Sequence, residues 1–140
     1  MTGMTKWIIV LLIGIYVLFR TLAALAMTVV RLTGEVAATM PAEQAAYFLA
    51  MPAIVIAFAW VSLFVSVAAM ALLAFERSGA TRALSIAVII DIASWLWERS
   101  VTPYTDVFTP AEQSLDALMF LAMISIVVMM MIARHRGTLT

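Results

Sequence analysis

The stretch from residue 53 to residue 75 contains no charged side chain. It is long enough to cross the hydrocarbon core of a bilayer as a helix, which takes roughly 20 mostly apolar residues. The rest of the chain is similar in character, because 66% of its residues are hydrophobic and 11% are charged. Soluble domains contain about 45–50% apolar and about 25% charged residues. We therefore predict an integral membrane protein.

Three further stretches have the length and apolar character of membrane helices. Together they predict an all-α bundle of four transmembrane helices that forms a single membrane domain over residues 1–140, with helices at about 7–31, 53–75, 81–99 and 112–134. Residues 41–51 predict a short amphipathic helix in the first outer loop, and Pro52 is expected to end it because proline interrupts the helical hydrogen bonds.

The distribution of Lys and Arg predicts the orientation, since cytoplasmic loops are enriched in these residues. With the N-terminus inside, most of them fall on the cytoplasmic side, namely Lys6, Arg77, Arg82, Arg134 and Arg136. Arg31 and Arg99 fall on the other side, where acidic residues gather, namely Glu35, Glu43, Asp106 and Glu112. We therefore predict that both termini are cytoplasmic, in a bacterial inner (plasma) membrane.

Arg20 and Asp91 lie within the predicted spans. At about 1.5 Å per helical residue, Arg20 is roughly 21 Å from Lys6, and Asp91 is roughly 13 Å from Arg82, so both lie near the middle of the bilayer. A lone charge at this depth costs about 2.5–3.5 kcal/mol on insertion scales, so such residues find partners inside a bundle. Tyr16 lies one turn before Arg20 and is placed to donate a hydrogen bond.

Three interpretations of these charges remain open. Arg20 and Asp91 form an ion pair that fixes the register of the first and third spans, or one of them pairs with another subunit, or they form a site for a substrate, a proton or an ion. Ser94 lies one turn after Asp91 and belongs to the same candidate site.

The second span has a stripe of small residues that suits close helix packing, made of Ala59, Ser62, Ser66 and Ala69. This face packs either inside the bundle or against a partner. The tetrapeptide Pro-Ala-Glu-Gln occurs at residues 41–44 and again at 110–113. It indicates either an internal duplication or two similar helix starts, and Thr109 with Glu112 satisfies the pattern of a capping box.

The sequence offers little for catalysis or cofactor binding. It contains no cysteine and a single histidine, His135, and it has no glycine-rich phosphate loop and no metal-spaced motif. Its eleven methionines have no His or Cys in support of a copper site. We predict no cofactor, no bound metal and no enzymatic activity. The formal net charge of zero gives no indication of nucleic-acid binding. Arg134, His135 and Arg136 are interpreted as an anchor at the inner surface.

These features lead to two hypotheses of function. The first is a non-catalytic integral membrane subunit that packs against or stabilises a larger membrane protein complex. The alternative is a small transporter or channel that works as an oligomer and uses Arg20 and Asp91 within the bilayer. The partners expected are the lipid bilayer and either other membrane subunits or further copies of the chain.

Overall fold

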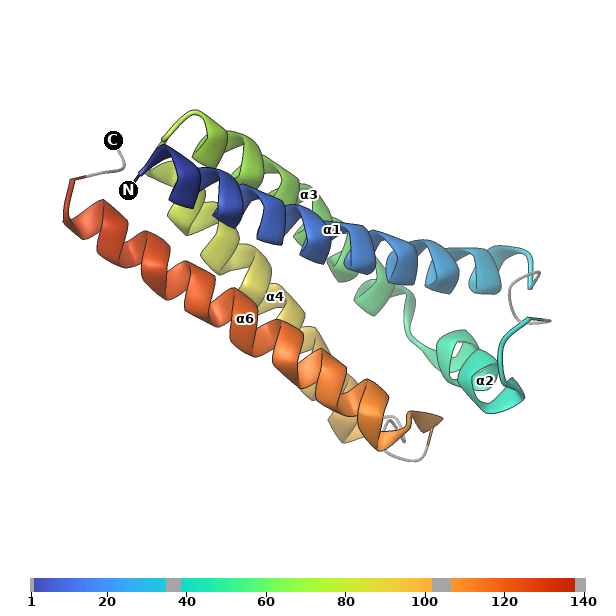
Figure 1. The fold of residues 1–140 in the computed structure, drawn as a ribbon. Helices are drawn as coiled ribbons and strands as arrows, with labels where there is room; N and C mark the ends of the chain where they lie inside the picture. The colour runs from blue at the N-terminus through green and yellow to red at the C-terminus, as the bar shows by residue number, and fades with distance from the viewer. Residues whose placement is uncertain (1, 35–38, 102–106, 138–140) are drawn as a thin grey trace.

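The computed structural model describes residues 2–34, 39–101 and 107–137, and these residues form helices and no strand (Figure 1). The five helices in this part of the chain are α1 (Gly3–Leu32), α2 (Ala42–Ala50), α3 (Ala53–Ala74), α4 (Gly79–Val101) and α6 (Pro110–His135). All except α2 are long and apolar enough to cross a membrane, which confirms the predicted all-helical class with four helices of membrane length. Glu35 and Asp106 lie outside the described residues.

Local chemistry explains where several helices begin. The hydroxyl of Thr2 accepts a hydrogen bond from the backbone N–H of Thr5 at 3.2 Å, which caps α1. At the start of α6 the Thr109 hydroxyl accepts from the Glu112 N–H, and the Glu112 carboxylate accepts from the Thr109 N–H at 2.8 Å. The predicted capping box is therefore confirmed. Pro52 separates α2 from α3 and occupies the N-cap position of α3.

The four long helices form a bundle in which both termini lie at the same end (Figure 1). Helix α3 is the centre of the bundle, because it packs most extensively against α4 and next against α1. Helix α6 lies on α4 and contacts α1 only slightly. The short helix α2 packs against α1 at the end opposite the termini (Figure 1). The side of the membrane on which α2 lies remains a prediction.

Two clusters of buried side chains divide the interior along its length. The cluster nearer the termini draws on all four long helices and comprises Ile9, Ile13, Tyr16, Ala69, Leu73, Ala80, Leu84, Val88, Met123, Ile126 and Met130. The second cluster comprises Ala24, Met27, Tyr47, Met51, Val55, Ile56, Ala59 and Leu63. Its buried members come from α1, α2 and α3 and the link between α2 and α3, without α6.

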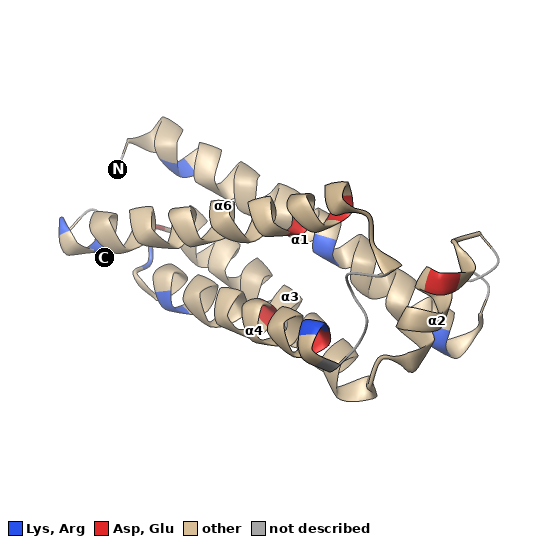
Figure 2. Ribbon diagram, turned by 90° about the horizontal axis from the view of Figure 1, so that it is seen from below, with Lys and Arg blue, Asp and Glu red and all other residues tan. Residues whose placement is uncertain are grey.

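Charged residues are also unevenly distributed along the bundle (Figure 2). The end with the termini holds the basic residues Lys6, Arg77, Arg82, Arg134 and Arg136, and Glu76 there pairs with Lys6 at 2.8 Å. Acidic residues are concentrated toward the other end, as Figure 2 shows. We call these the basic end and the acidic end. That the basic end is cytoplasmic is a prediction from the Lys and Arg distribution.

Candidate functional site

The structure brings Arg20 and Asp91 together inside the bundle. Arg20 Nη2 donates a hydrogen bond to Asp91 Oδ1 at 3.0 Å. The Tyr16 hydroxyl donates to the other carboxylate oxygen, Asp91 Oδ2. The side chain of Asp91 is 1% exposed and that of Arg20 is 25% exposed. Asp91 is thus a buried carboxylate with a partner on each oxygen, and both partners come from α1 in the same chain.

Helical spacing places these partners on one face. Tyr16 and Arg20 are four residues apart on α1, and side chains at this spacing lie on the same side of a helix. Ser94 and Glu98 follow Asp91 at three and seven residues along α4, so they extend the same polar face toward the acidic end.

A cavity of about 160 Å³ opens beside the ion pair. Residues of all five described helices line it, together with the links before α3 and α6: Arg20, Ala23, Met27, Tyr47, Phe48, Met51, Val55, Ala59, Asp91, Ser94, Trp95, Glu98, Phe108, Asp116 and Phe120. The cavity forms where α2 is inserted and where no residue of α6 belongs to the second buried cluster.

Acidic groups outnumber basic groups in this lining. Three carboxylates, those of Asp91, Glu98 and Asp116, face one guanidinium, that of Arg20. The Tyr47 hydroxyl donates a hydrogen bond to Glu98 Oε2 at 2.8 Å and holds this carboxylate in place without neutralising it. Arg99 stacks on the Trp95 ring at 4.8 Å from the ring centroid. Arg99 is not itself a lining residue, so among the residues that line the cavity the carboxylates outnumber the guanidinium groups.

Aromatic rings form much of the remaining wall. Tyr47 and Phe108 meet edge to face at 5.2 Å between ring centroids, and Phe48 lies 5.5 Å from Tyr47. On the α4–α6 side, Trp95 and Phe120 lie 5.5 Å apart. The cavity is therefore lined by carboxylates and by five aromatic side chains.

The other predicted residues lie elsewhere or contribute only in part. Ala59, Ser62, Ser66 and Ala69 are all buried on α3 inside the bundle, and only Ala59 lines the cavity. Ser62 Oγ donates to the backbone oxygen of Ala87 on α4 at 3.2 Å. This small-residue face therefore packs within the chain.

Sequence reasoning missed Glu98, Asp116 and the aromatic wall. Glu98 lies one residue before the end of the predicted span at 81–99, and its spacing of seven from Asp91 places it on the same helical face. The contributions of Tyr47, Phe108 and Phe120 depend on the tertiary arrangement of α2 and α6, which the sequence does not give. Across the described residues, no group of three or more His, Cys, Asp or Glu side chains is arranged to hold a metal ion.

Comparison of the chain with protein-family models, with curated proteins and with solved structures finds no match.

Proposed function

We propose that this chain binds a small organic cation within its membrane-spanning bundle, as a membrane transport or carrier protein. The observation that carries the proposal is that Asp91, Glu98 and Asp116 line one cavity together with aromatic rings. This is a form of the alternative hypothesis from the sequence, in which Arg20 and Asp91 belong to a site within the bilayer.

The charges favour a cationic ligand. Both carboxylate oxygens of Asp91 already accept hydrogen bonds, one from Arg20 and one from Tyr16, so the role of Asp91 is to fix the geometry of the cavity wall. Glu98 accepts its hydrogen bond from a neutral tyrosine, so this contact leaves the attraction of the carboxylate for a cation in place. In a low-dielectric interior this attraction is much stronger than it is in water.

The size and the wall of the cavity favour an organic ammonium group. A volume of about 160 Å³ is below the range of about 300–1,000 Å³ for sites of drug-sized ligands, so the ligand or its head group is small. Aromatic faces attract organic cations through cation–π interactions, which are strongest when water is excluded. The carboxylates, by contrast, are not grouped as metal ligands in the described part of the chain.

Choline and its neutral isostere 3,3-dimethylbutanol provide the test. Binding to the purified protein in a neutral detergent is measured by calorimetry and by tryptophan fluorescence, because Trp95 lines the cavity. We expect choline to bind and the isostere to bind weakly. Glu98→Gln keeps an acceptor for Tyr47 and removes the charge, and we expect it to weaken choline binding about tenfold or more.

Glu43→Gln is the matched control, because Glu43 is an exposed carboxylate of α2 that does not line the cavity. It should bind choline as the unaltered chain does. Equal binding of choline and the neutral isostere, or an unchanged affinity in Glu98→Gln, would overturn the proposal. Uptake of labelled choline into proteoliposomes then separates a transporter from a protein that only binds.

The non-catalytic subunit remains the second candidate, and one observation favours it. A groove of about 430 Å³ runs between α1 and α6, where these helices contact each other only slightly. Its lining is mostly apolar and includes Leu12, Phe19, Met119 and Met129, which suits a transmembrane helix of a partner. Native mass spectrometry of the protein extracted with its lipids tests this candidate, because a subunit would carry unrelated chains at fixed stoichiometry.

A further inference from the structure

The basic end carries a second candidate site on the opposite half of the molecule from the cavity. The first turns of α4 and the last turns of α6 border an open groove of about 380 Å³, lined by Thr81, Arg82, Ser85, Ile86, Met131 and Arg134. A shallow depression continues from it along α6, lined by Val128, Met131, Ile132, Arg134, His135 and Arg136. The two surfaces share Met131 and Arg134. We call the first of them, between α4 and α6, the α4–α6 groove.

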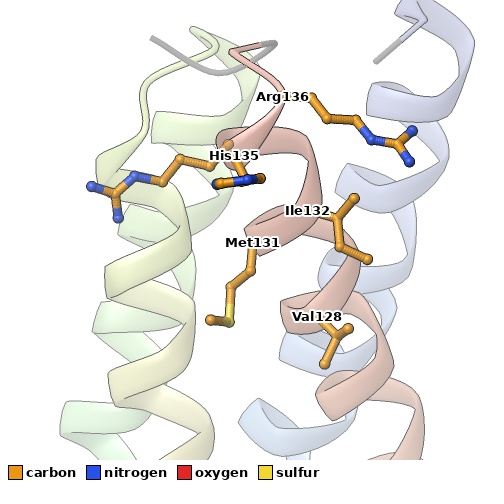
Figure 3. Close-up of a pocket in the computed structure, with 6 residues that line it drawn as sticks. Val128, Met131, Ile132, His135 and Arg136 are labelled. Carbon is orange, nitrogen blue, oxygen red and sulfur yellow. The ribbon is translucent and has the colours of Figure 1, made fainter.

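The α4–α6 groove is amphipathic along the bundle axis. Figure 3 shows His135 and Arg136 at the end of α6 and Met131 further along the helix, on the side away from Arg136 and Ile132. The apolar members are open to the surroundings, because Ile86 is 51% and Met131 is 56% exposed. Basic groups at the helix ends therefore lie beyond apolar side chains that extend into the membrane-spanning part.

The charges around the α4–α6 groove are of one sign. Arg82 and Arg134 line it, and its lining residues include no carboxylate. Lys6 and Glu76, which belong to α1 and to the turn after α3, pair with each other at 2.8 Å. Arg77 in the same turn adds further positive charge. The sequence alone shows only Arg134, His135 and Arg136 together; the fold adds Arg82 from α4.

We propose that the α4–α6 groove binds an anionic phospholipid. The guanidinium groups of Arg82 and Arg134 contact its phosphate, and an acyl chain lies along Ile86 and Met131. Guanidinium groups match phosphate oxygens in a bidentate arrangement, and basic pockets between membrane helices recognise anionic head groups. The predicted cytoplasmic orientation places this end in the leaflet that is rich in anionic lipid. The proposal is independent of the cation cavity.

The test compares lipid binding to the full chain in a neutral detergent. Native mass spectrometry counts bound phosphatidylglycerol and phosphatidylcholine at equal concentrations, and the thermal midpoint is followed with each lipid. We expect retention of phosphatidylglycerol in preference to phosphatidylcholine. Each Arg near a membrane surface contributes about 1 kcal/mol, so the double variant Arg82→Gln/Arg134→Gln should bind phosphatidylglycerol roughly tenfold to thirtyfold more weakly.

Two further variants make the test specific. Arg77→Gln removes an exposed charge at the same end outside the groove and should keep the preference for phosphatidylglycerol. Arg82→Lys/Arg134→Lys keeps the charge but loses the bidentate match to phosphate, so it should retain part of the preference, which separates recognition from a loss of folding. Equal binding of the two lipids, an equal loss in Arg77→Gln, or complete displacement of the lipid by inorganic phosphate would overturn the proposal.

Discussion

The two ends of the bundle use the same helices in different ways. At the basic end, α1, α3, α4 and α6 all contribute buried apolar side chains to one cluster, and Ile13, Leu73 and Leu84 are completely buried. At the acidic end, no residue of α6 belongs to the second buried cluster, α2 is inserted, and the interior contains a cavity that Phe120 of α6 lines.

The difference separates a closely packed apolar interior, which stabilises the bundle, from an interior with a cavity that has space for a ligand. Close packing of apolar side chains from four helices leaves no space for a ligand. A cavity lined by carboxylates and aromatic rings leaves such a space. Arg20, Tyr16 and Asp91 lie at the boundary between the two regions, because Tyr16 belongs to the apolar cluster while Asp91 lines the cavity.

The boundary ion pair should give the largest effect on stability. Arg20→Gln leaves the carboxylate of Asp91, 1% exposed, with only the Tyr16 hydroxyl, and removal of one partner of a buried pair costs about 3–5 kcal/mol. Asp91→Asn should cost less, because Arg20 still shares the cavity with Glu98. The double variant should lose less than the sum of the two single losses. Unfolding in mixed micelles of increasing sodium dodecyl sulfate measures all three.

Additive losses in this cycle would show that Arg20 and Asp91 act separately. The ion pair would then not be the element that joins the two ends. Ser125→Ala provides a control for handling of the protein, because the exposed Ser125 donates its hydrogen bond, at 2.8 Å, to the backbone oxygen of Leu121 in its own helix α6.

Truncation of two leucines on α3, one at each end, compares the packing of the two ends directly. Leu73 is 0% exposed in the cluster at the basic end, and Leu63 is 6% exposed in the cluster at the acidic end. Truncation of a buried leucine to alanine costs about 2–5 kcal/mol, depending on how far the site collapses. We expect Leu73→Ala to lie near the upper part of this range and Leu63→Ala near the lower part. Equal costs in the same unfolding assay would contradict the proposed difference in packing.

Substitution of Ser62 or Ser66 by alanine should change the stability less, and in different directions. Ser62→Ala removes the hydrogen bond to Ala87, and such bonds between membrane helices contribute about 0.6 kcal/mol on average. The buried hydroxyl of Ser66 has no hydrogen-bond partner among the residues that the structure describes. Ser66→Ala should therefore be neutral or slightly stabilising, because it removes a polar group from an apolar site. A loss in Ser66→Ala as large as that in Ser62→Ala would contradict this.

Much of the fold follows from the sequence, because membrane helices are defined by local composition. The predicted span at 53–75 ends within one residue of α3, and the capping residues at Thr109 and Glu112 set the start of α6. The short helix and its end before Pro52 also follow from local chemistry. Each of these features depends on residues that are neighbours along the chain.

The site was less accessible from the sequence, because it depends on how helices pack. Arg20, Asp91 and Tyr16 attract attention since charges in a membrane are costly. Glu98 and Asp116 lie near the ends of predicted spans, where a carboxylate is ordinarily solvated, and only the packing of α2 and Phe108 over the acidic end encloses them in a cavity. No sequence pattern within α1 or α6 shows that these two helices contact each other only slightly.

The smallest effect is expected from the exposed ion pair at the basic end, which contrasts with the pair at the boundary. The hydrogen bond and charge of Lys6 hold the pKa of Glu76 below its ordinary value of 4.5. A carboxylate with a lowered pKa contributes stability above its ordinary value and loses it as the pH falls through the lowered pKa. The stability difference between the unaltered chain and Glu76→Gln should be small at pH 7 and should disappear as the pH falls through the lowered pKa of Glu76.

Salt provides the second measurement on this pair. Glu76 is exposed, so the difference at pH 7 should shrink further in 0.5 M sodium chloride, whereas the loss in Arg20→Gln should persist because Asp91 is shielded from solvent. If Glu76→Gln lost as much stability as Arg20→Gln, or if both losses disappeared in salt, burial would not be what separates the two pairs. The stability losses of the exposed pair and of the buried pair therefore measure how burial changes the contribution of an ion pair in this bundle.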